Sequence, residues 1–141
     1  MGTKKKIALV AVPLAILSFS LSFVIWPNPV GVAVPGAHLV PYFMIVSAFE
    51  SVAFGVGVAL LIFGWPLLQR LGATGHLAAA AFVSAVWSLI SWWPHDNMHR
   101  VNGMDNFNGL LRIEYMFHVT LIVAGFIVAA YLWRLMSQEK S

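Results

Sequence analysis

The stretch IALVAVPLAILSFSLSFVIW, residues 7–26, decides the fold class of this chain. It runs for 20 residues without a charged side chain, and an α-helix of about 20 apolar residues spans the hydrocarbon core of a bilayer. Lys4, Lys5 and Lys6 precede it and resemble the charged start of a signal peptide, but the apolar run is longer than a signal-peptide core. We therefore interpret the stretch as a transmembrane helix.

Three further apolar stretches follow the same pattern, at residues 42–68, 77–94 and 113–133. The chain is 60% hydrophobic and 9% charged, whereas an average soluble protein is roughly half apolar and a quarter charged. The four spans use most of the 141 residues and leave no room for a separate soluble domain. The sequence therefore predicts an all-α integral membrane protein, built as a single transmembrane domain with four helices in a bundle.

The basic residues predict how this bundle is oriented. Arg100 and Arg112 fall on one side of a four-span arrangement, and the other six fall on the opposite side: Lys4, Lys5, Lys6, Arg70, Arg134 and Lys140. Because cytoplasmic segments carry an excess of Lys and Arg, we expect both termini in the cytoplasm and two loops, residues 27–41 and 95–112, facing outward. The expected location is a plasma or inner membrane, with lipids as partners. Orientation accounts for the basic residues, so we expect no nucleic-acid partner.

Two pairs of metal-ligating residue types fall in the outward half of the chain. His95 and His99 are four residues apart, and Glu114 and His118 repeat the same spacing in the fourth span. Residues at i and i+4 share one face of a helix, so each pair can point at a common centre. We predict that these four residues bind a transition metal such as zinc, copper or iron.

Other residues of the outward half could extend this site. Glu50 lies within the second span, where an ionisable residue is costly and is by default a functional candidate. Met98 offers a thioether, which suits copper(I). His38 and Asp96 are placed at the periphery. Cysteine is absent, which excludes thiolate ligands and iron–sulfur clusters.

Small residues predict where the helices touch. Gly55, Gly57 and Gly64 in the second span suit close packing between membrane helices. In the fourth span, Gly125 and Ala129 continue the helical face of Glu114 and His118. We expect both sets to lie at helix–helix contacts.

Two alternative functions remain open. The chain could be a non-catalytic subunit of a larger membrane complex, because almost nothing of it lies outside the bilayer. It could instead be a metal-free binder of a lipid-like ligand, or an enzyme that uses Glu50 and His118 as acid and base. The chain has no phosphate loop, nucleophile elbow or dinucleotide fingerprint, so we predict no organic cofactor.

The charge distribution makes the topology testable. In a bacterial inner membrane, alkaline phosphatase should be active when inserted at Gly103 and inactive when fused after Ser141, whereas green fluorescent protein should fluoresce only at the C-terminus. Both reporters measure the side of the membrane directly. Active phosphatase at the C-terminus would contradict the predicted orientation.

Overall fold

The computed structural model describes residues 1–31, 36–70, 74–103 and 106–138, and every regular element in these ranges is a helix. In chain order they are α1 (Thr3–Ile25), α2 (Val40–Phe63), α3 (Trp65–Arg70), α4 (His76–Asn102), α5 (Phe107–Ile113), the π-helix η1 (Glu114–Val119) and α6 (Thr120–Gln138). Four helices are long and apolar enough to cross a membrane: α1, α2, α4 and the continuous run Phe107–Gln138. The all-helical class is confirmed, and the four long helices are compatible with a membrane bundle.

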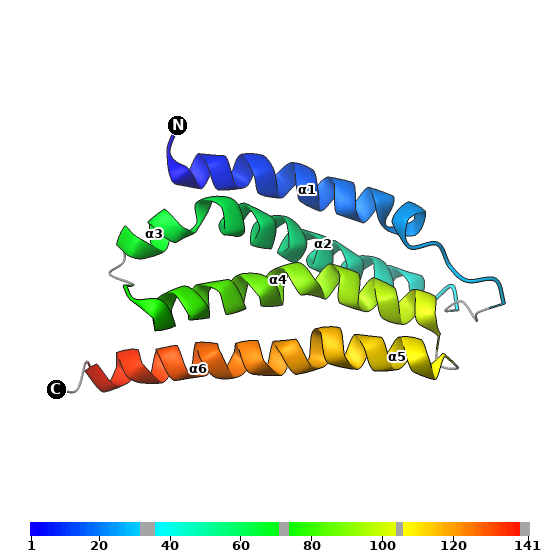
Figure 1. The fold of residues 1–141 in the computed structure, drawn as a ribbon. Helices are drawn as coiled ribbons and strands as arrows, with labels where there is room; N and C mark the ends of the chain where they lie inside the picture. Colours follow the sequence, from blue (N-terminus) through cyan, green and yellow to red (C-terminus); the bar gives the residue numbers. More distant parts are fainter. Residues whose placement is uncertain (32–35, 71–73, 104–105, 139–141) are drawn as a thin grey trace.

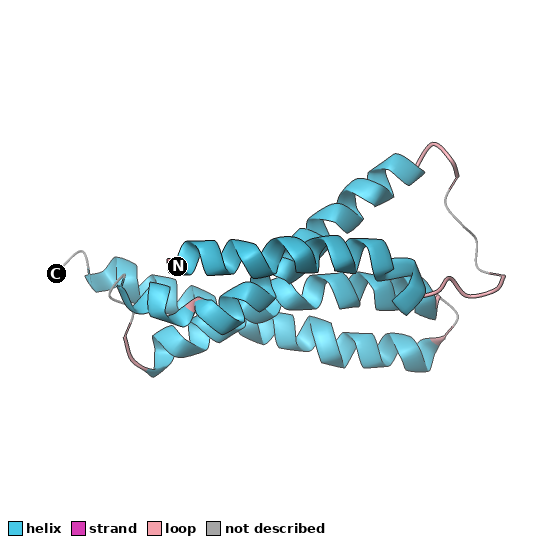
Figure 2. Ribbon diagram, turned by 90° about the horizontal axis from the view of Figure 1, so that it is seen from above, coloured by secondary structure: helices cyan, strands magenta, loops and turns pink. Residues whose placement is uncertain are grey.

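The long helices pack in chain order (Figure 1). The main contacts join α1 to α2, α2 to α4, and α4 to α6. The start of α1 and the end of α6 lie at one end of the molecule, and the end of α1, the start of α2, the end of α4 and the start of α5 lie at the other, which we call the loop end. The N-terminal half of α2 leans away from the neighbouring helices at the loop end (Figure 2). Helix α4 is therefore the central element, with α1 and α2 on one side of it and α6 on the other.

Glycines in α2 allow it to approach both neighbours closely. A Cβ atom added at Gly55 would collide with the backbone oxygen of Ala11 in α1 and lie 2.9 Å from the Ala15 nitrogen. A Cβ atom at Gly57 would lie 2.7 Å from the Ile90 side chain in α4. Both glycines are buried, which confirms the predicted use of small residues for helix packing.

Helix α4 continues through Pro94, where the third span was expected to end, and reaches Asn102. A proline inside a helix removes one backbone hydrogen bond, but membrane helices tolerate it because their neighbours compensate for the freed groups. His99 and Arg100 in the last turn also favour the negative end of the helix dipole. As a result, His95 and His99 lie on a helix and not in a loop.

The fourth span begins earlier than expected, at Phe107. The Asn106 side chain accepts a hydrogen bond from the Gly109 backbone N–H at 3.0 Å and so caps α5. The segment that was expected to be an outward loop, residues 95–112, is therefore mostly helical. Hydrogen bonds between Asn102 and Asn106 join the end of α4 to the start of α5.

The predicted contact face at Gly125 and Ala129 is wrong. Both residues are exposed, and nothing lies within 4 Å of a Cβ atom built at Gly125, whereas Ala124 is buried. Ile113, Phe117 and Ala124 are buried, and their i, i+4, i+11 spacing places them on one helical face. The face that packs against α4 therefore lies one residue before the predicted face along the whole fourth span.

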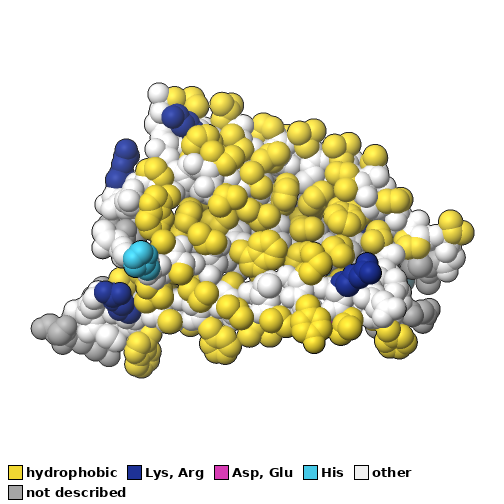
Figure 3. Space-filling view, in the orientation of Figure 1, with side chains coloured by type: hydrophobic (Ala, Val, Ile, Leu, Met, Phe, Trp, Pro, Cys, Tyr) yellow, Lys and Arg dark blue, Asp and Glu magenta, His cyan; other side chains and the backbone are white. Residues whose placement is uncertain are grey.

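The outer surface is suited to lipid. Figure 3 shows apolar side chains over most of one face, with Lys and Arg side chains toward its two ends. Large apolar side chains such as Val24, Phe126 and Trp133 are exposed. A protein in water rarely exposes apolar area on this scale, so the surface supports the assignment to a membrane.

The packing of α2 on α1 predicts opposite effects for one substitution at two sites. Gly55→Ala should destabilise the protein by about 1–3 kcal/mol because the new methyl group forces α1 and α2 apart. Gly125→Ala should be neutral or stabilising by up to about 1 kcal/mol, since alanine favours a helix and the site is open. Thermal unfolding in detergent, monitored by size-exclusion chromatography, measures the stability of both variants. Equal midpoints for the two variants would contradict the packing described here.

Candidate metal centre

Three histidine side chains from two helices meet near the loop end. His95 and His99 lie one turn apart on α4, and His118 lies on η1. The Nε2 atom of His95 is 2.8 Å from Nε2 of His118 and 3.2 Å from Nε2 of His99. One nitrogen from each ring can be chosen so that all three lie within 4.8 Å of one another. The three histidines are therefore close enough together to hold a metal ion.

The nitrogen spacing is near that of a tetrahedral site. Zinc–nitrogen bonds of about 2.0–2.1 Å place two tetrahedral ligand atoms about 3.3 Å apart. The two contacts of His95, at 2.8 and 3.2 Å, come close to that separation. Small ring rotations would bring the third pair into range, because the upper limit within the group is 4.8 Å. Three imidazoles fill three tetrahedral positions and leave the fourth for another ligand.

Glu114 lies behind His118 and not among the three Nε2 atoms. One of its carboxylate oxygens is 2.7 Å from Nδ1 of His118. A carboxylate can only accept, so Nδ1 of His118 donates the hydrogen, and in the neutral ring Nε2 then carries the lone pair that a metal needs. Carboxylates orient metal-binding histidines in this way in many metalloproteins.

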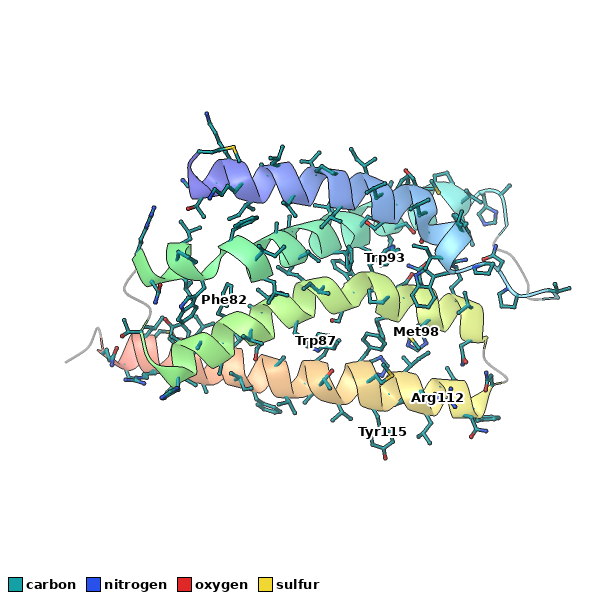
Figure 4. The ribbon with its side chains drawn as sticks, turned by 45° about the horizontal axis from the view of Figure 1, so that its top comes forward. Phe82, Trp87, Trp93, Met98, Arg112 and Tyr115 are labelled. Atoms are coloured by element: carbon teal, nitrogen blue, oxygen red, sulfur yellow. The ribbon has the colours of Figure 1, made fainter. Side chains whose placement is uncertain are left out.

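Aromatic residues hold η1 against α4 beneath the histidines. Phe117 is buried, stacks on Trp87 with ring centroids 6.2 Å apart, and lies 5.2 Å from the His95 ring. The Trp87 indole N–H donates a hydrogen bond to the Thr120 hydroxyl at 3.0 Å. Figure 4 shows Trp87 between α4 and α6. These contacts hold the Phe117 face of η1 against α4. Because His118 follows Phe117 directly, they also position the His118 side chain.

The centre lies at the edge of the helix packing. The side chains of His118 and Glu114 are 37% and 54% exposed, and His95 and His99 are half-buried. Tyr115, next to Glu114, points away from the other helices (Figure 4). A metal or small ligand could therefore reach the histidines without passing through the core.

Glu50 belongs to a different group of residues. Its side chain is 1% exposed, and neither carboxylate oxygen has a hydrogen-bond partner in the described part of the chain. The charged side chains that interact electrostatically with the Glu50 carboxylate are Asp96 and Arg100 of α4. No hydrogen bond or ion pair between described residues joins Glu50 to a histidine. Asp96, which was placed at the periphery, is thus a neighbour of Glu50.

A polar network on the opposite face of α4 was missed by sequence reasoning. Asn97 accepts hydrogen bonds from Ser22 of α1 at 2.9 Å and from Arg100 at 2.7 Å, and its amide donates to the Trp93 carbonyl at 2.7 Å. Arg100 also donates to the Trp26 carbonyl at 2.8 Å. The signal was present in the sequence, because residues 93, 97 and 100 follow the i, i+4, i+7 spacing of one helical face.

The remaining candidates have other surroundings. Met98 lines a pocket between α4 and α5, and His38 is exposed just before α2. His76 begins α4 and is exposed at the end opposite the centre. No protein-family model, curated protein or solved structure matches this chain, so its functional assignment rests on its own geometry.

Proposed function

We propose that the chain is an integral membrane metal-binding protein in which His95, His99 and His118 bind a transition metal through Nε2. The observation that carries the proposal is the convergence of three ring nitrogens from α4 and η1 within 4.8 Å. Zinc suits this ligand set best, because three imidazoles with one open position form a familiar zinc site. Copper and iron also accept imidazole ligands, so they are the competing metals.

In this proposal Glu114 is a positioning residue. It holds His118 through Nδ1, at 2.7 Å, and makes the imidazole a stronger ligand. Glu50 and Met98, considered as further ligands from the sequence, are left out because Glu50 is beside Asp96 and Arg100 and Met98 faces another pocket. The ligand set is therefore smaller than the sequence suggested.

The other hypotheses have less support from the geometry. An acid–base pair of Glu50 and His118 would require the two side chains to act on one substrate, but Glu50 interacts with α4 and His118 with Glu114 and His95. A role as a subunit of a larger membrane complex stays a prediction. So does the orientation with cytoplasmic termini, which would place the loop end and the histidines on the outer side.

The metal proposal predicts one bound zinc ion per chain. After incubation with zinc and removal of the excess, elemental analysis should find about one equivalent in the wild type and a clear loss in His99→Ala and His118→Ala. His76→Ala is the matched control, because His76 is exposed at the far end of α4. Wild-type protein without zinc, copper or iron after such loading would refute the proposal, as would folded His99 and His118 variants that keep the metal.

The role of Glu114 is tested by Glu114→Gln. Glutamine can still accept the hydrogen bond from Nδ1 of His118 but removes the negative charge, so zinc affinity should fall by about 10-fold, within the usual 10–100-fold cost of losing such a partner. The number of ions bound at saturation should not change. Competition with a coloured chelator measures the affinity. Tyr115→Phe, on the exposed side of η1, serves as control, and equal affinities for the two variants would contradict the positioning role.

A further inference from the structure

A second site lies at the loop end between α4 and α5. It is a cavity of about 300 Å³ lined by apolar and by polar residues, which we call its apolar wall and its polar wall. Figure 4 shows two of its lining residues, Met98 on α4 and Arg112 on α5. Trp26, Met98 and Val101 supply apolar surface, and the polar side includes Asn102, Asn108 and Arg112. Such a mixed lining is typical of pockets for small amphipathic ligands.

Hydrogen bonds between neighbouring residues hold the polar wall in place. The Asn106 amide donates to the Asn102 side-chain oxygen at 2.9 Å, and the Asn102 amide donates to the Asn106 carbonyl at 3.1 Å. The Gly109 backbone N–H then binds the Asn106 side-chain oxygen at 3.0 Å. These residues hold each other across the α4–α5 link, so the pocket is preformed.

Two donor groups on this wall have no partner among the described residues. Arg112 is the only charged side chain among the described residues that line the cavity, and it forms no ion pair or hydrogen bond with any of them. The Asn108 amide is likewise without a hydrogen bond in the described chain. A guanidinium group prefers planar anions such as carboxylate and phosphate, which it can bind through two parallel hydrogen bonds. The wall is therefore complementary to an anion.

The position of the pocket explains the apolar wall. The cavity lies where the helices end, and in a membrane this is the level of the lipid head groups. Tryptophan and arginine are typical of that level because one part of each side chain is apolar and the other polar. A volume of about 300 Å³ is at the small end of the range for ligand pockets, so it suits a head group and not a whole lipid.

We propose that this pocket binds the anionic head group of an amphiphile, a phosphate or carboxylate attached to an acyl chain. Arg112 and Asn108 donate to the anion, while Trp26, Met98 and Val101 contact the first carbons of the chain. Met98 precedes the metal-site residue His99, and Arg112 lies two residues before Glu114, so the pocket and the histidines share the same two helical segments. Binding of the head group does not depend on a metal.

Lipid titration of the full chain tests this proposal. The protein in detergent is titrated with short-chain phosphatidic acid, with phosphatidylcholine of the same chain length, and with inorganic phosphate, and bound lipid is counted by native mass spectrometry. We expect about 10-fold tighter binding of phosphatidic acid than of phosphatidylcholine, the usual size of a charge-assisted hydrogen-bond effect. Arg112→Gln should remove this preference. Arg134→Gln, the same change at the opposite end of the molecule, should keep it.

Three results would overturn the proposal. The first is equal binding of the two lipids by the wild type, and the second is an unchanged preference in Arg112→Gln. The third is displacement of phosphatidic acid by inorganic phosphate at matching concentrations, which would show that the acyl chain adds nothing. Zinc content measured in the same samples separates this outcome from a failure of the metal proposal.

Discussion

The unbroken course of α4 is the constraint on which the other features depend. Because the helix continues through Pro94 to Asn102, successive residues of its last turns point to different neighbours. His95 and His99 meet His118 of η1, while Asn97 and Arg100 contact α1 through Ser22 and the Trp26 carbonyl. If α4 ended at Pro94, the residues that make both sets of contacts would lie in a loop and not on a rigid helix. In the hydrocarbon region, moreover, a helix that stopped early would leave backbone groups without partners.

The two polar groups on α4 differ in their surroundings. The histidine group is partly exposed at the edge of the packing, where ligands can be exchanged. The second group, Asn97 with its partner Ser22 of α1, is buried, as is Glu50 of α2. Asn97 accepts a hydrogen bond from Ser22 of α1 and is held within α4 by Trp93 and Arg100, which fixes the register of α1 against α4. The first group is therefore suited to binding, and the second contributes to the way the helices are assembled.

The sequence predicted the parts of the structure that follow from composition and regular spacing. Four apolar spans, the close packing at Gly55 and Gly57, and the shared i, i+4 face of His95 and His99 all depend on helical periodicity alone. The parts that were missed depend on local events. Pro94 does not end α4, and Asn106 starts the next helix early. The buried face of the fourth span runs through Ile113, Phe117 and Ala124, and not through Gly125 and Ala129. The fourth span is strongly apolar, so helical periodicity alone could not tell which of two adjacent faces packs against α4.

The packing of the helices in chain order has a mechanical consequence. Helix α6 meets the other long helices chiefly through α4, and the three histidines straddle that seam. An ion held there would act as a crosslink between the C-terminal helix and the remainder of the molecule. The free energy of binding the ion would then contribute to the free energy of packing α6 against α4, as it contributes to folding in small metal-dependent domains. The angle of α6 to α4 and the occupancy of the site would become a single linked equilibrium, so that supply of the ion would govern the shape of the protein within the bilayer.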